Sequence, residues 1–276
     1  MSGLGWAEFG DPAGRPVVFV HGYASSRQAA GWTLAGDLLA RAGLRVLAPD
    51  RPGYGRTPPM PPGQWTARVA ARLEGLGPVV VAGVSMGASA ALRLAVARPG
   101  QVARVALLSG MPPVPAHAWS PAAKADAFYW RLARRTPWLL RGLCAVSARA
   151  MASAGARVIP RVERALPAAD LEVFRARAGT AQAAFLADAA ESGRQGGAAM
   201  SDDLLVHLRP WDFAVEEVKA PVWLLHGVDD PKVPVELARS LAARLPGVEA
   251  AYLPGGHFAP FADQEALMAV LGGSRI

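Results

Sequence analysis

Apolar runs and stretches of helical periodicity alternate along the first 110 residues of the chain. The runs are mostly continuous rather than alternating, and four of them predict buried strands: 17–20, 45–49, 79–83 and 102–108. Between the runs, apolar positions recur at helical spacing over residues 32–41 and 87–98. Continuous apolar strands that alternate with helices are typical of a parallel sheet covered on both faces. The sequence therefore predicts an α/β fold with a doubly wound, mostly parallel sheet.

The strand pattern stops near residue 111 and returns near residue 221. Between these points a proline after Ser120 and helical spacing of apolar residues predict helices and no strand. These helices are expected at 120–137, 138–153, 161–166 and 168–191. Further strands are expected at 222–225 and 249–253, and further helices at 235–245 and 264–271. We predict a core of residues 1–110 and 211–276 and an all-helical insertion, 111–210, of roughly 100 residues, long enough to act as a lid.

Residues 83–87 read G-V-S-M-G, a G-x-S-x-G pattern between a predicted strand and a predicted helix. In this context the pattern forms a sharp strand-to-helix turn that exposes the serine hydroxyl. Glycines are needed on both sides because larger side chains would collide with the neighbouring strand and helix. A serine elsewhere is usually a helix cap or a surface hydroxyl, so its position makes Ser85 the candidate nucleophile.

A serine hydroxyl needs a base, and after a nucleophile of this kind the acid and then the histidine follow later in the chain. His257 meets this requirement, because it follows the last predicted strand in a loop opened by two glycines. His117 and His207 end no strand and fit surface positions better. His21 and His226 do end strands, but each is followed at once by glycine and then by other candidate site residues. Both are therefore expected to be structural.

The acid that orients the imidazole is expected just beyond a strand. Two adjacent carboxylates, Asp229 and Asp230, follow the predicted strand 222–225. Either one could instead be a turn aspartate or the cap of the following helix. The pattern of strands and helices alone leaves the choice between them open.

An oxyanion hole needs two backbone donors that converge on one point. The N–H of Met86 follows the nucleophile and supplies one donor. The second is expected from the loop after the strand 17–20, where Gly22 allows a close approach and the N–H of Tyr23 is the candidate donor.

Successive segments of the chain resemble the signatures of the α/β-hydrolase superfamily, as found in bacterial members with a helical lid. The segments are His21-Gly22, residues 50–57 (D-R-P-G-Y-G-R-T), 83–87, 226–234 (H-G-V-D-D-P-K-V-P) and 256–258 (G-H-F). In related sequences the second acidic position of the fourth segment is the triad member, which implies Asp230. The segment 50–57 is expected to be a structural turn.

The resemblance covers nearly the whole chain and implies a serine hydrolase that works by two-step acyl transfer without a cofactor or metal. A serine nucleophile argues against the haloalkane dehalogenase and epoxide hydrolase members, which use aspartate at that position. The expected substrate is a carboxylic ester of a small apolar molecule. A C–C bond hydrolase or a lyase that uses the same triad remains an alternative. Two further alternatives are a protein that binds a small molecule with negligible turnover and a lipase that acts at a membrane.

Aromatic residues are frequent in the predicted lid. Four of them are candidates to line a substrate pocket: Trp119, Phe128, Trp130 and Trp138. Aromatic side chains are equally common in pockets and in packed cores, so packing between lid and core explains them as well.

Charge and cysteine content narrow the classes of partner. The formal net charge is +7, and residues 111–210 hold 13 Lys or Arg against 8 Asp or Glu. We interpret this excess as a solvated helical surface, with steering of an acidic substrate or an anionic surface as the alternative. No nucleic-acid-binding module is recognisable. The single cysteine, Cys144, cannot form an internal disulfide and fits a core position. No secretory signal and no membrane span are evident, so a cytoplasmic protein is expected; the sequence does not indicate the oligomeric state.

Overall fold

The computed structural model describes residues 3–114 and 124–274. Within them, seven strands form one sheet in the order β1-β3-β2-β4-β5-β6-β7. The strands are β1 (Trp6–Gly10), β2 (Arg15–Val20), β3 (Leu44–Pro49), β4 (Val79–Val84), β5 (Val102–Leu108), β6 (Val222–Gly227) and β7 (Val248–Leu253). β1 pairs antiparallel with β3 and the remaining neighbours pair in parallel. The predicted doubly wound, mostly parallel sheet is confirmed.

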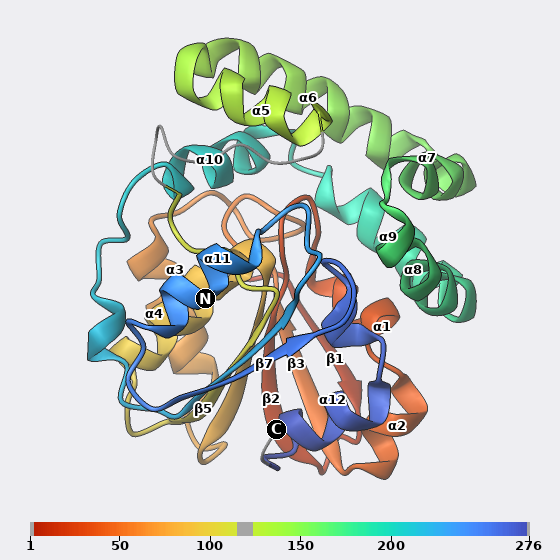
Figure 1. The fold of residues 1–276 in the computed structure, drawn as a ribbon. Coiled ribbons are helices and arrows are strands. Elements are labelled where there is room, and N and C mark those ends of the chain that lie inside the picture. The colour runs from red at the N-terminus through yellow and green to blue at the C-terminus, as the bar shows by residue number, and fades with distance from the viewer. Residues whose placement is uncertain (1–2, 115–123, 275–276) are drawn as a thin grey trace.

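Helices cover both faces of the sheet, which explains why the strands are apolar on both sides (Figure 1). In β2, Val18 packs in one core cluster and Phe19, which points the other way, packs in the second. The first cluster lies under α3 (Pro62–Arg72), α4 (Ala88–Ala97) and α11 (Val235–Ala242), and the second lies under α1 (Ala30–Thr33), α2 (Gly36–Arg41) and α12 (Gln264–Leu271). Each fully buried Val, Leu or Phe side chain contributes about 1.5–3 kcal/mol to the stability of this arrangement.

A helical insertion connects β5 to β6, and we use this name for residues 124–207. Its helices are α5 (Lys124–Arg135), α6 (Pro137–Ser153), α7 (Val158–Ala165), α8 (Ala168–Thr180), α9 (Gln182–Ser192) and α10 (Ala198–His207). α5 and α6 form the outermost layer, above α10 and away from the sheet (Figure 1). The described part of residues 111–210 contains no strand, as predicted. The domain boundaries and the role of the insertion as a lid stay predictions.

Four helical elements differ from the predictions, and one of them, α3, was not predicted at all. The helix expected at 168–191 is two helices, because Ala181 has non-helical dihedrals after a Gly-Thr pair that weakens the helix. The helix expected at 32–41 is likewise interrupted, at Leu34, whose backbone is extended. α10 was not predicted either, because its buried residues include Ser201 and His207 and no apolar stripe stands out.

No helix of the described residues is long and apolar enough to cross a membrane. The start of the helix expected at Ser120 lies outside the described residues.

Candidate active site

Ser85 lies in the turn between β4 and α4, and its backbone has a φ of +50°. This left-handed conformation costs a residue with a side chain about 1–3 kcal/mol and persists only where packing enforces it. The flanking glycines allow the close approach: a Cβ on Gly87 would lie 2.5 Å from the carbonyl oxygen of Val20, and one on Gly83 would lie 2.8 Å from the Cβ of Ala91. The turn therefore has the steric requirement predicted from the sequence, and it places Ser85 at the start of a helix.

Asp230 and His257 meet beyond the ends of β6 and β7. The Nδ1 atom of His257 donates to Oδ2 of Asp230 at 2.7 Å. The other oxygen, Oδ1, accepts from the backbone N–H groups of Lys232 at 2.8 Å and Val233 at 2.9 Å. An ionised carboxylate can only accept, so Nδ1 carries the proton and the lone pair of Nε2 is left to act as a base.

Electrostatics keep the Asp230 carboxylate ionised. Burial acts to raise its pKa, but the electrostatic interaction with His257, the hydrogen bond from its Nδ1 and the N–H of Val233 outweigh burial, so the pKa of Asp230 lies below its ordinary value. A buried carboxylate that stays charged stabilises the imidazolium that forms when the base takes a proton. Asp229 is exposed, and of the two carboxylates it is Asp230 that the structure brings to His257.

The backbone of His257 lies one strand away from the nucleophile turn. The hydroxyl of Ser109 donates to the carbonyl oxygen of His257 at 2.8 Å. Ser109 directly follows β5 and Ser85 directly follows β4, and these strands pair in register up to their last residues. Neighbouring strands lie about 4.8 Å apart. Ser85, His257 and Asp230 therefore share the carboxyl edge of the sheet.

The loop after β2 passes directly against the candidate nucleophile. A Cβ on Gly22 would lie 3.2 Å from the Cβ of Ser85 and 3.9 Å from its Oγ. Among the described residues no acceptor is found for the N–H of Tyr23. Met86 lies in the first turn of the helical segment, where N–H groups have no intrahelical partner. Both predicted oxyanion donors are thus near Ser85.

The aromatic residues proposed to line a pocket are not brought together. Trp130 is buried in a cluster that includes Met86. Trp138 is 73 % exposed and Phe128 is 45 % exposed. Leu140 is on the buried face of α6, and Trp138, two positions earlier, points about 200° away around the helix. Trp119 lies outside the described residues, so its place in a pocket stays a prediction, whereas Trp138 points to solvent and does not share a pocket with the buried Trp130.

Sequence reasoning did not anticipate that His226 would lie beside the acid. The Nε2 atom of His226 donates to the carbonyl oxygen of Val233 at 2.7 Å and lies 3.5 Å from Oδ2 of Asp230. Burial lowers the pKa of His226, so its imidazole is neutral. Its position at the end of β6 was the only available signal, and sequence alone does not distinguish a support for Asp230 from a residue of the core.

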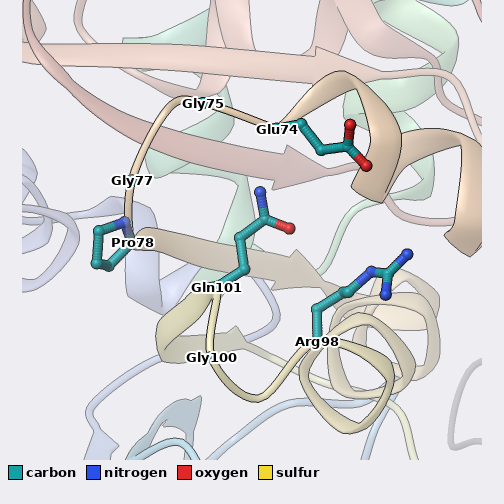
Figure 2. Close-up of a pocket in the computed structure, with 7 residues that line it drawn as sticks. All are labelled: Glu74, Gly75, Gly77, Pro78, Arg98, Gly100 and Gln101. Atoms are coloured by element: carbon teal, nitrogen blue, oxygen red, sulfur yellow. The ribbon is translucent and has the colours of Figure 1, made fainter.

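An open hollow at the opposite edge of the sheet has no part in this site (Figure 2). It is lined by Glu74, Gly75, Gly77, Pro78, Arg98, Gly100 and Gln101. These residues precede β4 and β5, whereas the candidate catalytic residues follow the strands. Among the described residues, no three His, Cys, Asp or Glu side chains are grouped so that they could hold a metal ion.

Comparison with known proteins places these features in context. The sequence model of the alpha/beta hydrolase fold matches residues 15–263. The chain is 30 % identical over 266 residues to a pimeloyl-[acyl-carrier protein] methyl ester esterase of Aromatoleum aromaticum. The aligned region covers 92 % of this chain and 95 % of that protein.

Solved structures agree with this fold. The enol-lactonase of Burkholderia xenovorans superposes with a TM-score of 0.63 at 19 % identity, over 97 % of this chain and 94 % of that one. A bromoperoxidase of Bacillus anthracis superposes with a TM-score of 0.64 at 20 % identity, over 97 % and 94 %. At this level of identity the similarity establishes the fold alone.

Proposed function

The chain belongs to the alpha/beta hydrolase fold family, and we propose that it is a serine hydrolase that cleaves carboxylic esters through Ser85, His257 and Asp230. The observation that carries the proposal is the 2.7 Å hydrogen bond from Nδ1 of His257 to Oδ2 of Asp230 beside the strained Ser85 turn. The curated relative that matches nearly the whole chain is an esterase, which supports ester cleavage over other chemistry.

The mechanism follows from which atoms are left free. The Oγ of Ser85 attacks the ester carbonyl while its proton passes to Nε2 of His257. The N–H groups of Tyr23 and Met86 donate to the oxyanion of the tetrahedral intermediate. His257 then protonates the departing alcohol. A water that His257 deprotonates next attacks the acyl enzyme, which releases the acid and restores Ser85.

The helical insertion is proposed to act as the lid that shapes the acyl or alcohol pocket. Trp130 and Met86 belong to one buried cluster, so the inner side of the insertion reaches the residue that follows the nucleophile. An apolar wall there favours an apolar group next to the ester. We also propose that the protein is cytoplasmic.

One surface favours a more specific substrate. The exposed side of α6 carries two apolar and two basic side chains: Trp138, Val146, Arg141 and Arg149. Around the helix axis, each points within about 80° of the mean direction of the four. Trp138 is 73 % exposed and Val146 is 67 % exposed. Arginine around exposed apolar residues suits an acidic protein partner. The name of the curated relative gives a pimeloyl methyl ester on an acyl-carrier protein as its substrate. Our candidate substrate is therefore a methyl ester of an acyl chain on a carrier protein that presents an acidic surface to α6.

That candidate is tested with two substrates that carry the same acyl methyl ester, one on a carrier protein and one on a short thiol. We expect Arg141→Glu with Arg149→Glu to raise KM for the carrier-bound ester and leave the small ester unchanged. An equal KM for both substrates in the wild type and in the variant would remove the carrier from the proposal.

The general proposal is tested by hydrolysis of a p-nitrophenyl ester series. Ser85→Ala is expected to abolish turnover, and Ser89→Ala, one turn along α4, is expected to retain it. Wild-type protein that is inert towards every ester but cleaves a β-diketone would favour the C–C hydrolase alternative. Failure of every substrate and of a fluorophosphonate probe would favour a binding protein.

A further inference from the structure

The Gly22–Tyr23 peptide is held from its carbonyl side. The carbonyl oxygen of Gly22 accepts two hydrogen bonds, from Nδ1 of His21 at 3.0 Å and from Nη2 of Arg51 at 2.8 Å. In a trans peptide the C=O and the following N–H point in opposite directions. Fixing the Gly22 oxygen therefore fixes the direction of the Tyr23 N–H.

The tautomer of His21 is set by its second contact. Its Nε2 accepts from the backbone N–H of Arg51 at 3.0 Å, so the proton is on Nδ1 and is donated to Gly22. Burial, together with the charges of Arg51 and Arg27, holds the pKa of His21 well below its ordinary value. The ring is therefore neutral, and its donor stays aimed at the carbonyl.

The Arg51 guanidinium is held in turn by the helical insertion. Its Nη1 and Nη2 atoms reach the two carboxylate oxygens of Asp203 at 2.7 Å each, and both side chains are mostly buried. Tyr54 donates its hydroxyl to the same carboxylate at 2.7 Å. Asp203 belongs to α10, so a helix of the insertion determines where Arg51 meets Gly22.

The same loop is tied to the insertion at its other end. Asp188, a buried residue of α9, accepts from the backbone N–H of Ser26 at 2.7 Å and from its hydroxyl at 2.8 Å. The hydroxyl of Ser25 and the indole N–H of Trp32 donate to it at 3.0 Å. The loop is therefore held on both sides of Tyr23, by α9 through Asp188 and by α10 through Asp203 and Arg51.

We propose that Arg51 and Asp203 are positioning residues for the oxyanion hole, and that α9 and α10 are a fixed part of the active site. A hydrogen bond from a charged guanidinium polarises the Gly22–Tyr23 peptide and strengthens its N–H as a donor. Donors that are oriented before the reaction stabilise the developing oxyanion most effectively. The inference rests on the proposed function, because it requires the Tyr23 N–H to bind the oxyanion.

The test replaces both charged partners at once, as Arg51→Met with Asp203→Leu, because removing one would leave a buried, unpaired charge. We expect kcat for a p-nitrophenyl ester to fall by about 10- to 100-fold, because a displacement of about 1 Å in a catalytic group lowers the rate on this scale. The affinity for a trifluoromethyl ketone, which mimics the tetrahedral intermediate, should fall by a similar factor, whereas KM should change little. Tyr54→Phe is the matched control, since Tyr54 donates to the same carboxylate but not to Gly22.

The two claims fail in different ways. A folded double variant with wild-type kcat and wild-type ketone affinity overturns the inference, as does a loss of activity that the ketone affinity does not follow. If the double variant does not fold, Arg51→Lys decides, because an ammonium keeps the charge but lacks the planar fork with which the guanidinium reaches both Asp203 and the Gly22 carbonyl. An unchanged ketone affinity in Arg51→Lys overturns the inference. Retained ester hydrolysis in Ser85→Ala, measured in parallel, would overturn the proposed function instead.

Discussion

Nδ1 of His257 lies 2.7 Å from Oδ2 of Asp230, although the two residues are 27 positions apart in the chain. The approach depends on Gly227, where a Cβ would lie 2.0 Å from the carbonyl oxygen of Gly256. The loops after β6 and β7 can therefore pack together only because position 227 has no side chain. The contact joins a buried carboxylate to an imidazole at the edge of the sheet where Ser85 lies.

Replacing Asp230 by Asn should impair catalysis far more than folding. The amide carries no charge to stabilise the imidazolium and can present a donor to Nδ1, which favours the wrong tautomer. We expect kcat to fall by roughly 10³- to 10⁴-fold, as for the corresponding change in serine proteases. Asp229→Asn is the neighbouring control and should retain most activity, because Asp229 is exposed. Equal losses in the two variants would contradict the assignment of Asp230.

The glycine after the nucleophile should be intolerant of any side chain. In Gly87→Ala the new Cβ would lie 2.5 Å from one backbone oxygen and 2.6 Å from another, so β2 and its loop must shift. We expect a loss of about 1–3 kcal/mol in the free energy of unfolding, measured in urea. Gly142→Ala, in the interior of α6 with open space around the position, should instead stabilise by about 0.5–1 kcal/mol. An unchanged free energy of unfolding in Gly87→Ala would show that the turn has room for a side chain.

Asp188 should make stability depend on pH. Burial raises the pKa of Asp188 from 3.8 to about 6, although Trp32, Ser26 and Ser25 donate to it. The folded state then keeps a proton that the unfolded chain releases, so this residue's contribution to stability is full below pH 3.8 and is lost as the pH rises through about 6. The two pKa values differ by about 2 units, or about 3 kcal/mol.

The variant Asp188→Asn cannot release a proton. The difference in unfolding free energy between this variant and the wild type should therefore shift in favour of the variant by up to about 3 kcal/mol between pH 4 and pH 7. Urea unfolding at several pH values measures the shift, with Asp37→Asn on the exposed surface of α2 as the control. A difference that is constant with pH would show that the Asp188 carboxyl is ionised on both sides of this range.

The sequence predicted the parallel strands and the order of the catalytic residues because both leave local signals. A strand buried on both faces is apolar throughout, as in Val17–Val20, and the nucleophile turn requires glycines at fixed positions. β1 was missed because an edge strand of alternating, partly exposed residues has no such run.

The parts that could not be predicted depend on contacts between distant segments. The pair Arg51–Asp203 spans 152 positions and Ser26–Asp188 spans 162. Both carboxylates are on helices whose sequence gives no sign of what they face. The position of Trp138 could not be predicted for the same reason. From the sequence, an aromatic residue in the insertion is a candidate to line a pocket, but the orientation of α6 places Trp138 on the surface.

The role of Ser85 as the nucleophile is tested most directly by mass spectrometry of the protein after reaction with a fluorophosphonate. We expect one adduct per chain, located by peptide mapping at Ser85, and none in Ser85→Ala. Asp230→Asn should react much more slowly, because His257 is then poorly oriented. An adduct at another residue, or the same extent of labelling in Ser85→Ala, would contradict the assignment of Ser85.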